Sequence, residues 1–201
     1  IGPGANTTLY GGYAGEPYSK TTLLQAIGNK VGKENVLFAQ GCKLTDNASD
    51  TAQFNWKMNE IKITPHKTNE KLIAEAIAVA KKSDIIILAI GENEQLCREA
   101  WSEKHLGDNL SLDLFGDQQE LADSLLALEK PLIVYLQNGR PLSINKLQAK
   151  ANAIVEAWYM GQEGCIAGAD VLFGDVNPSG KLTVTFPKNV GQLPMYYNHK
   201  P

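Results

Sequence analysis

The chain has 201 residues, of which 43% are apolar and 20% charged, and its formal net charge is −3. This length and composition predict a globular domain with one sizeable core. The slightly negative charge argues against nucleic acid or an anionic membrane as a partner, and no apolar run approaches the roughly 20 residues of a membrane span.

Short, continuous apolar runs, which are typical of buried parallel strands, occur at four places. They lie at Val36–Ala39, Asp84–Ile90, Leu132–Leu136 and Ala153–Trp158, and Ile1-Gly2 fits the tail of a fifth strand. Between these runs, apolar residues recur every three or four positions, which predicts helices. The helices are expected over Thr21–Val31, Thr68–Lys82, Asp117–Leu128 and Gly164–Phe173, with Thr68 as an N-cap.

The segment after the last helix predicts one further strand. Leu182–Phe186 alternates and is rich in β-branched residues, which favours an antiparallel edge strand that ends before Pro187. With its strand–helix alternation, the whole chain (1–201) is predicted to be a single α/β domain. We expect a three-layer αβα sandwich with a mainly parallel sheet and one antiparallel edge strand. The ends of the chain, with neither an initiator Met nor a natural stop, predict that this domain belongs to a larger protein.

Patterns for cofactor or metal binding are weak. The three cysteines are far apart and form no Cys-x-x-Cys pair, and the three histidines show no metal-ligand spacing. Gly161–Gly164 joins a strand to a helix, as phosphate-binding loops do, but it lacks the Gly-x-Gly-x-x-Gly and P-loop patterns. We therefore expect no metal, no cofactor and no disulfide framework.

In an open α/β sheet, ligands bind beyond the carboxyl ends of the strands. The loops that leave such ends here are Gly41–Lys67, Gly91–Asp113, Gln137–Pro141 and Tyr159–Gly164. Gly91–Asp113 is about 23 residues long, and loops of that length in a compact domain are often functional. It combines carboxyl and basic side chains with Trp101, a set that suits proton transfer to a sugar and stacking on its ring. A solvated loop that is merely charged fits these residues as well.

Several short motifs follow one another along the chain. They are Asn93-Glu94-Gln95, Arg98–Asp108, Gln118–Leu121, Asn138-Gly139-Arg140-Pro141, Glu156-Ala157-Trp158-Tyr159, Gly161-Gln162-Glu163-Gly164, Ala169–Asp175, Asn177–Leu182 and Phe186-Pro187. In this order, and over nearly the whole chain, they resemble family 3 glycoside hydrolases of the bacterial β-glucosidase type. Cys165 departs from the pattern, because the family often has a second glycine there, and we interpret it as a packing change.

The resemblance implies that the chain is the second domain of a two-domain retaining glycosidase. In the family, a barrel domain carries the aspartate nucleophile, and the α/β sandwich carries the acid/base carboxyl on a loop that reaches into the shared cleft. The enzyme would cleave terminal β-D-glucosyl residues from oligosaccharides or from aryl and alkyl β-glucosides. The barrel domain would be the partner of this chain, which would be inactive alone. The family also implies a periplasmic or secreted bacterial protein.

Within this resemblance, Glu103 is the first candidate for the acid/base. It shortly precedes Gly107-Asp108-Asn109-Leu110, as a glutamate does in the family, although one extra residue intervenes. Glu99 is the second candidate and Glu92 the third. The expected substrate-binding residues are Arg98, Trp101, His105 and Asp108. Surface ion pairing is the alternative for Arg98 and His105, and a core or interface position is the alternative for Trp101.

Rival functions stay open. A β-xylosidase of the same family fits the same motifs, and so does a non-catalytic carbohydrate-binding or assembly domain that kept the sandwich. A flavodoxin-like domain would instead contact phosphate or a nucleotide at Gly161–Gly164. Arg140 and Glu163 are expected to brace the bases of the loops rather than to touch sugar.

Overall fold

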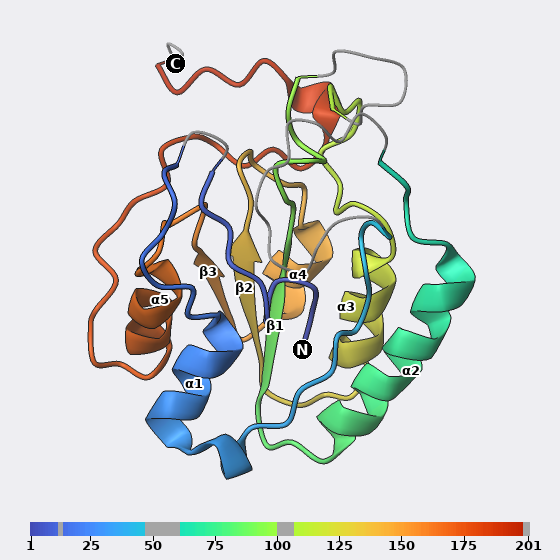
Figure 1. The fold of residues 1–201 in the computed structure, drawn as a ribbon. Helices are drawn as coiled ribbons and strands as arrows, with labels where there is room; N and C mark the ends of the chain where they lie inside the picture. The colour runs from blue at the N-terminus through green and yellow to red at the C-terminus, as the bar shows by residue number, and fades with distance from the viewer. Residues whose placement is uncertain (12–13, 47–60, 100–106, 199–201) are drawn as a thin grey trace.

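The computed structural model describes residues 1–11, 14–46, 61–99 and 107–198. Its elements, in chain order, are α1 (Leu23–Val31), the 3-10 helix η1 (Lys33–Asn35), α2 (His66–Lys81), β1 (Ile86–Gly91), α3 (Gln118–Leu126), β2 (Leu132–Gln137), α4 (Asn145–Lys150), β3 (Ala153–Glu156), α5 (Gly164–Leu172) and the 3-10 helix η2 (Val190–Gln192). The strands form one parallel sheet in the order β1-β2-β3 (Figure 1).

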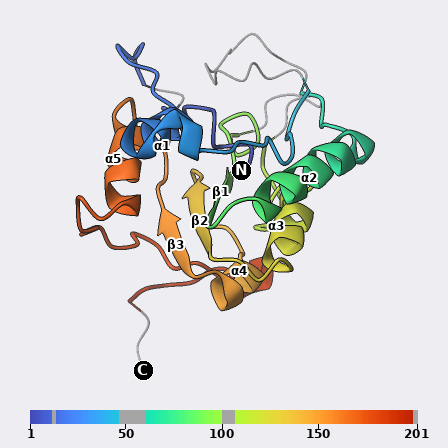
Figure 2. The ribbon, with the colours of Figure 1, turned by 90° about the horizontal axis from the view of Figure 1, so that it is seen from below.

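Helices cover both faces of this sheet. α1 and α5 lie on one face, and α2, α3 and α4 lie on the other (Figure 2). Successive side chains of a strand point to opposite faces, so each strand contributes to two apolar clusters. Leu88 and Val134 pack in the cluster with α2, α3 and α4, whereas Ala89 and Tyr135 pack in the cluster with α1 and α5. The predicted three-layer sandwich with a parallel sheet is confirmed.

β1 and β2 are buried along almost their whole length, as their continuous apolar runs predict. They pair in register from Ile86 opposite Leu132 to Gly91 opposite Gln137. Gly91 has a φ of 144°, and a Cβ at this position would lie 2.0 Å from the carbonyl oxygen of Gln137. Only glycine therefore lets the two strands stay paired to their last residue.

The strands predicted at Ile1-Gly2 and Val36–Ala39 are present as extended segments beside the sheet, without strand geometry of their own. The N-terminal amine of Ile1 donates to the carbonyl oxygen of Ile87 at 3.0 Å, and the amide of Ala89 donates to that of Ile1 at 2.8 Å. One residue bonded to both neighbours of its partner is the pattern of parallel pairing. Gly2 in turn donates to the carbonyl oxygen of Ala39 at 3.3 Å. The hydrogen bonding of the sheet therefore continues beyond β1, through Ile1 and Gly2 to Ala39.

The predicted edge strand at Leu182–Phe186 is wrong. The segment bends at Thr183 and Val184, and Leu182 and Val184 are 58% and 47% exposed. Two helix predictions also need correction, since α2 begins at His66 after Pro65 rather than at Thr68, and α4 was not predicted. Among the described residues, no helix has the length and apolar character needed to cross a membrane.

Candidate functional site

The three strands end at one edge of the sheet, because Gly91 pairs with Gln137 and Leu136 pairs with Glu156. Polar side chains gather there despite their burial. Glu92 is 2% exposed and Asn138 is fully buried. The long loop that follows β1 rises from this edge, above the sheet in Figure 1. This is the edge at which ligands are expected in a parallel α/β sheet.

Arg140 ties the loop after β2 to both ends of the loop after β1. Its guanidinium donates to the two carboxylate oxygens of Glu92, with Nε 3.0 Å from Oε2, and its Nη1 donates to the carbonyl oxygen of Ser111 at 2.6 Å. Glu92 was the third candidate for the acid/base. Because both of its oxygens accept from a guanidinium, its geometry fits a bracing role instead, as the sequence predicted for Arg140.

The loop after β1 is closed at its base by bonds between its two limbs. The amide of Asp108 donates to the carbonyl oxygen of Arg98 at 3.1 Å, and the side-chain amide of Asn109 donates to the carbonyl oxygen of Leu96. Leu96 is fully buried and anchors the first limb. We call residues 96–98 and 108–109 the loop neck. These bonds hold together the described residues that flank positions 100–106.

Three of the predicted site residues, Arg98, Glu99 and Asp108, fall in or beside this neck. The structure brings Arg98 and Asp108 together through their backbones, and both Glu99 and Asp108 are exposed. Asp108 has a left-handed backbone with a φ of 43°, which aspartate tolerates better than most residues. Burial lowers the pKa of the Arg98 guanidinium, and the charge of Glu94 opposes that shift. Trp101, Glu103 and His105 lie outside the described residues.

Two carboxyl groups at this edge were not ranked from the sequence, although both lie in its motifs. Burial raises the pKa of Glu94, whose Oε1 accepts from the amide of Gly11 at 2.7 Å. Burial raises the pKa of Glu156, at the end of β3, to about 7. Its carboxyl accepts from the amide of Trp158 at 3.0 Å and from the side-chain amide of Asn138 at 3.3 Å. The position of Glu156 at the carboxyl end of a parallel strand was the signal that could have identified it.

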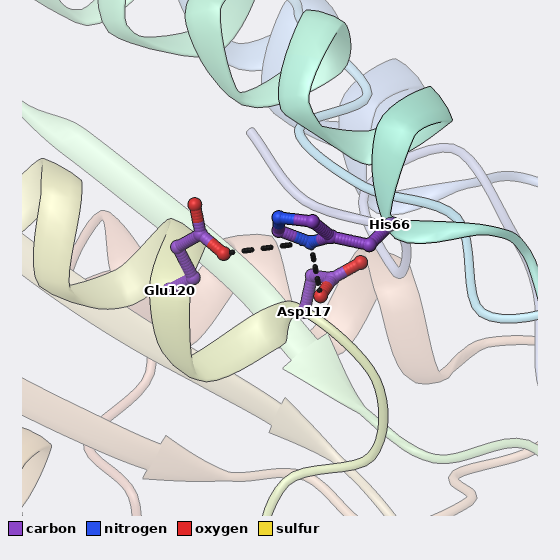
Figure 3. Close-up of side chains that lie close together, drawn as sticks. All are labelled: His66, Asp117 and Glu120. Atoms are coloured by element: carbon purple, nitrogen blue, oxygen red, sulfur yellow. Dashed lines mark hydrogen bonds and ion pairs between the residues drawn. The ribbon is translucent and has the colours of Figure 1, made fainter.

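A second polar cluster joins α2 to α3, away from the loop neck. His66 Nδ1 lies 2.9 Å from Asp117 Oδ1 and 3.7 Å from Glu120 Oε2 (Figure 3). Asp117 also accepts from the buried side chain of Asn69 at 2.7 Å. In the described part of the chain, these three residues form a group whose possible metal-ligand atoms all lie within 4.8 Å of one another. The hydrogen bond to Asp117 raises the pKa of His66, which favours the protonated imidazole beside the two carboxylates.

The sequence as a whole matches one protein family and several of its members. Residues 1–201 match the family described as the glycosyl hydrolase family 3 C-terminal domain. The periplasmic β-glucosidase of Salmonella typhimurium is 39% identical over 187 residues, which are 92% of this chain and 24% of that protein. A β-xylosidase of Formosa agariphila is 37% identical over 194 residues, which are 96% of this chain and 23% of that protein. The chain thus spans about a quarter of the length of these relatives.

Solved structures of β-glucosidases contain the same fold. A β-glucosidase from Erythrobacter marinus superposes with a TM-score of 0.89 at 41% identity, covering 100% of this chain and 27% of that one. The β-glucosidase of Listeria innocua in complex with isofagomine superposes with a TM-score of 0.69 at 27% identity, covering 99% of this chain and 25% of that one.

Proposed function

Because the chain belongs to the glycosyl hydrolase family 3 C-terminal domains, we propose that it is the second domain of a retaining β-glucosidase. In this proposal the whole enzyme releases terminal β-D-glucosyl residues from oligosaccharides and from aryl or alkyl β-glucosides. The observation that carries it is the polar loop after β1, which leaves the ligand-binding edge of the sheet through a closed neck. A barrel domain of the same protein is the partner that completes the cleft.

Retention of configuration needs two carboxyl groups about 5–5.5 Å apart across the glycosidic bond. In the first step, a carboxylate of the barrel domain attacks the anomeric carbon while the acid/base of this chain protonates the departing oxygen. In the second step, the same group takes a proton from water, which then attacks the glycosyl-enzyme. We assign the acid/base to Glu103 and keep Glu99, at the neck, as the second candidate.

The acid/base must hold its proton near neutral pH, so its pKa must be raised by burial or by a neighbouring negative charge. At the sheet edge, burial has this effect on the pKa of two other carboxyl groups, Glu94 and Glu156. The nucleophile of the barrel domain provides the negative charge. The proposal therefore predicts that the acid/base acquires its working pKa only in the assembled two-domain enzyme.

A β-xyloside is the second candidate substrate. It is supported by the Formosa relative, which is named a β-xylosidase and is similar over 96% of this chain. Xylose lacks the hydroxymethyl group of glucose, and a site that bonds to that group strongly rejects sugars without it. Comparing aryl β-glucosides with aryl β-xylosides decides between the two substrates. Binding of both sugars without turnover would identify a non-catalytic carbohydrate-binding domain instead.

The cellular location of the full-length protein is inferred from a relative in the same way. The Salmonella relative is named a periplasmic β-glucosidase, which supports a periplasmic or secreted location for the full-length protein. Cell fractionation of the native host, with antibodies against this domain, tests the location.

The acid/base assignment is tested in the full-length protein with Glu103→Gln and Glu99→Gln. General acid catalysis contributes about 10²–10⁴-fold, and it matters most for poor leaving groups. The variant that lacks the acid/base should lose activity on alkyl glucosides but still form the glycosyl-enzyme from dinitrophenyl glucoside. It should regain turnover when azide is added. Glu75→Gln, at an exposed position of α2, is the matched control. If Glu103→Gln and Glu99→Gln both match this control on every substrate, the acid/base lies elsewhere and the proposal fails.

A further inference from the structure

One tyrosine joins the loop after β3 to the neck of the loop after β1. The hydroxyl of Tyr159 lies 3.1 Å from Cys97 Sγ and 3.5 Å from the carbonyl oxygen of Glu92. The thiol of Cys97 donates to the carbonyl oxygen of Asn93 at 3.2 Å. The phenol donates to the carbonyl oxygen of Glu92, and either the phenol or the thiol can be the donor in the contact between Tyr159 and Cys97.

The contact between Tyr159 and Cys97 joins two uncharged groups. Burial raises the pKa of the Tyr159 phenol and that of the Cys97 thiol above their ordinary values. The phenol therefore keeps its proton throughout the neutral range.

The backbone of Trp158 turns the chain so that Tyr159 reaches the neck. Trp158 has a φ of 53°, a left-handed conformation that is uncommon for a bulky residue and persists only when its surroundings impose it. The carboxyl of Glu156 accepts from the amide of Trp158 at 3.0 Å, and Asn138 holds the other carboxyl oxygen. The indole packs against Phe186 with ring centroids 5.8 Å apart.

The ring of Tyr159 also rests on the backbone of the neighbouring loop. A Cβ at position 139 would lie 2.9 Å from Cε2 of Tyr159, closer than real Cβ contacts come. Gly139 thus lets the ring lie directly against the end of β2. With its ring against Gly139, Tyr159 places its hydroxyl beside Cys97 of the loop neck.

We propose that Tyr159 is a positioning residue for the acid/base of the glycosidase reaction. Its hydroxyl fixes the loop neck from the β3 side, as Arg140 fixes the loop ends from the β2 side. This inference rests on the proposed function, because it places the acid/base on residues 99–107. Displacement of a reacting group by about 1 Å can cost on the order of 10²-fold in rate, so a neck that shifts slightly misplaces the proton donor. Tyr159 acts through Cys97 rather than on the substrate.

The test compares Tyr159→Phe with the wild type in the full-length enzyme. This substitution keeps the ring on Gly139 and removes only the hydroxyl. The matched control is Tyr135→Phe, because Tyr135 is fully buried and its hydroxyl has no hydrogen-bond partner among the described residues. We expect Tyr159→Phe to lower kcat/KM about 10-fold for an alkyl glucoside and by less than about 3-fold for dinitrophenyl glucoside, since only the former needs the acid. The control should show no such selectivity.

A double-variant cycle tests whether Tyr159 acts through Cys97. Cys97→Ala should show the same selective loss as Tyr159→Phe, and the double variant should lose no more than the worse single variant. An equal loss on both substrates in Tyr159→Phe, or losses that multiply in the double variant, would overturn the proposal.

Hydrogen exchange provides a readout that does not need catalysis. The amides of Leu96 and Asp108, which bond within the loop and its neck, should exchange faster in Tyr159→Phe than in Tyr135→Phe. Equal exchange in the two variants overturns the positioning role. The test distinguishes failure of the proposed function from failure of the positioning role. A wild type that cleaves no glycoside refutes the proposed function and the positioning role together, whereas an active wild type with an unaffected Tyr159→Phe refutes the positioning role alone.

Discussion

Arg140 donates to both carboxylate oxygens of Glu92, whose side chain is fully buried, and so joins the loops that follow two adjacent strands. Removal of the guanidinium would leave a buried carboxylate without its partner. Breaking such a pair costs about 3–5 kcal/mol when both groups are buried. Since the Arg140 side chain is 22% exposed, we expect Arg140→Ala to lower the free energy of unfolding by about 2–3 kcal/mol. Urea denaturation of the 201-residue chain measures this change.

The control for that measurement is Lys146→Ala. Lys146 pairs with Asp123, but the two side chains are 58% and 35% exposed. Exposed pairs contribute about 0–1 kcal/mol, so this variant should unfold almost like the parent. Equal losses in the two variants would show that the Arg140–Glu92 pair does not hold the loops.

Glu156→Gln should stabilise the chain at alkaline pH more than at acid pH. Burial raises the pKa of Glu156 from 4.5 to about 7 in the folded state. Between these values the folded state binds more protons than the unfolded state, so this group's contribution to stability is lost as pH rises. Glutamine carries no charge and keeps an acceptor for the amide of Trp158. We expect a gain on the order of 1 kcal/mol at pH 8 and little gain at pH 5.

Thermal unfolding of parent and variant at pH 5 and pH 8 measures that difference. Glu163→Gln, also beyond β3 but exposed, controls for the loss of a surface charge. A gain from Glu156→Gln that is as large at pH 5 as at pH 8 would contradict the assignment of the raised pKa to this group.

His66 should stabilise the chain in acid and not in base. The hydrogen bond to Asp117 raises the pKa of His66 above 6.5 in the folded state, and the charges of Asp117, Glu120 and Glu70 add to the shift. The stabilisation is therefore fully present below pH 6.5 and is lost as pH rises through the folded-state pKa. His66→Ala should lower Tm at pH 5.5 and have little effect at pH 9.

An Asp117→Asn background checks the cause of the His66 effect. With the first partner neutralised, the difference between the pH 5.5 and pH 9 effects of His66→Ala should shrink. An unchanged difference would mean that Asp117 is not the partner that matters.

The parallel sheet could be predicted from the sequence because burial on both faces leaves continuous apolar runs, as in Leu132–Leu136. Alternation is weaker evidence. Leu182–Phe186 alternates, yet β-branched alternation indicates only an extended chain, and a strand also needs a free sheet edge beside it. α4 escaped prediction because six residues are too few to show a helical period. The start of α2 was missed because His66 and Lys67 precede the first apolar position of the helix.

The gathering of polar side chains at one edge of the sheet could be predicted, since the ends of parallel strands share that edge. The contacts between these side chains could not be predicted. Tyr159 and Cys97 are 62 residues apart, and their contact depends on the left-handed turn at Trp158, for which no glycine marks the sequence. His66 meets Asp117 across 51 residues only because α2 packs beside α3. Such contacts come from tertiary geometry, which residue spacing does not encode.

The loop neck bears on how much change the chain tolerates between the two limbs of this loop. Bonds between Arg98 and Asp108, and between Leu96 and Asn109, make the frame independent of what lies between them. Doubling the length of a closed loop costs only about 0.6 kcal/mol in closure entropy. We therefore expect insertions and exchanges between the two limbs of the neck to leave the sandwich folded.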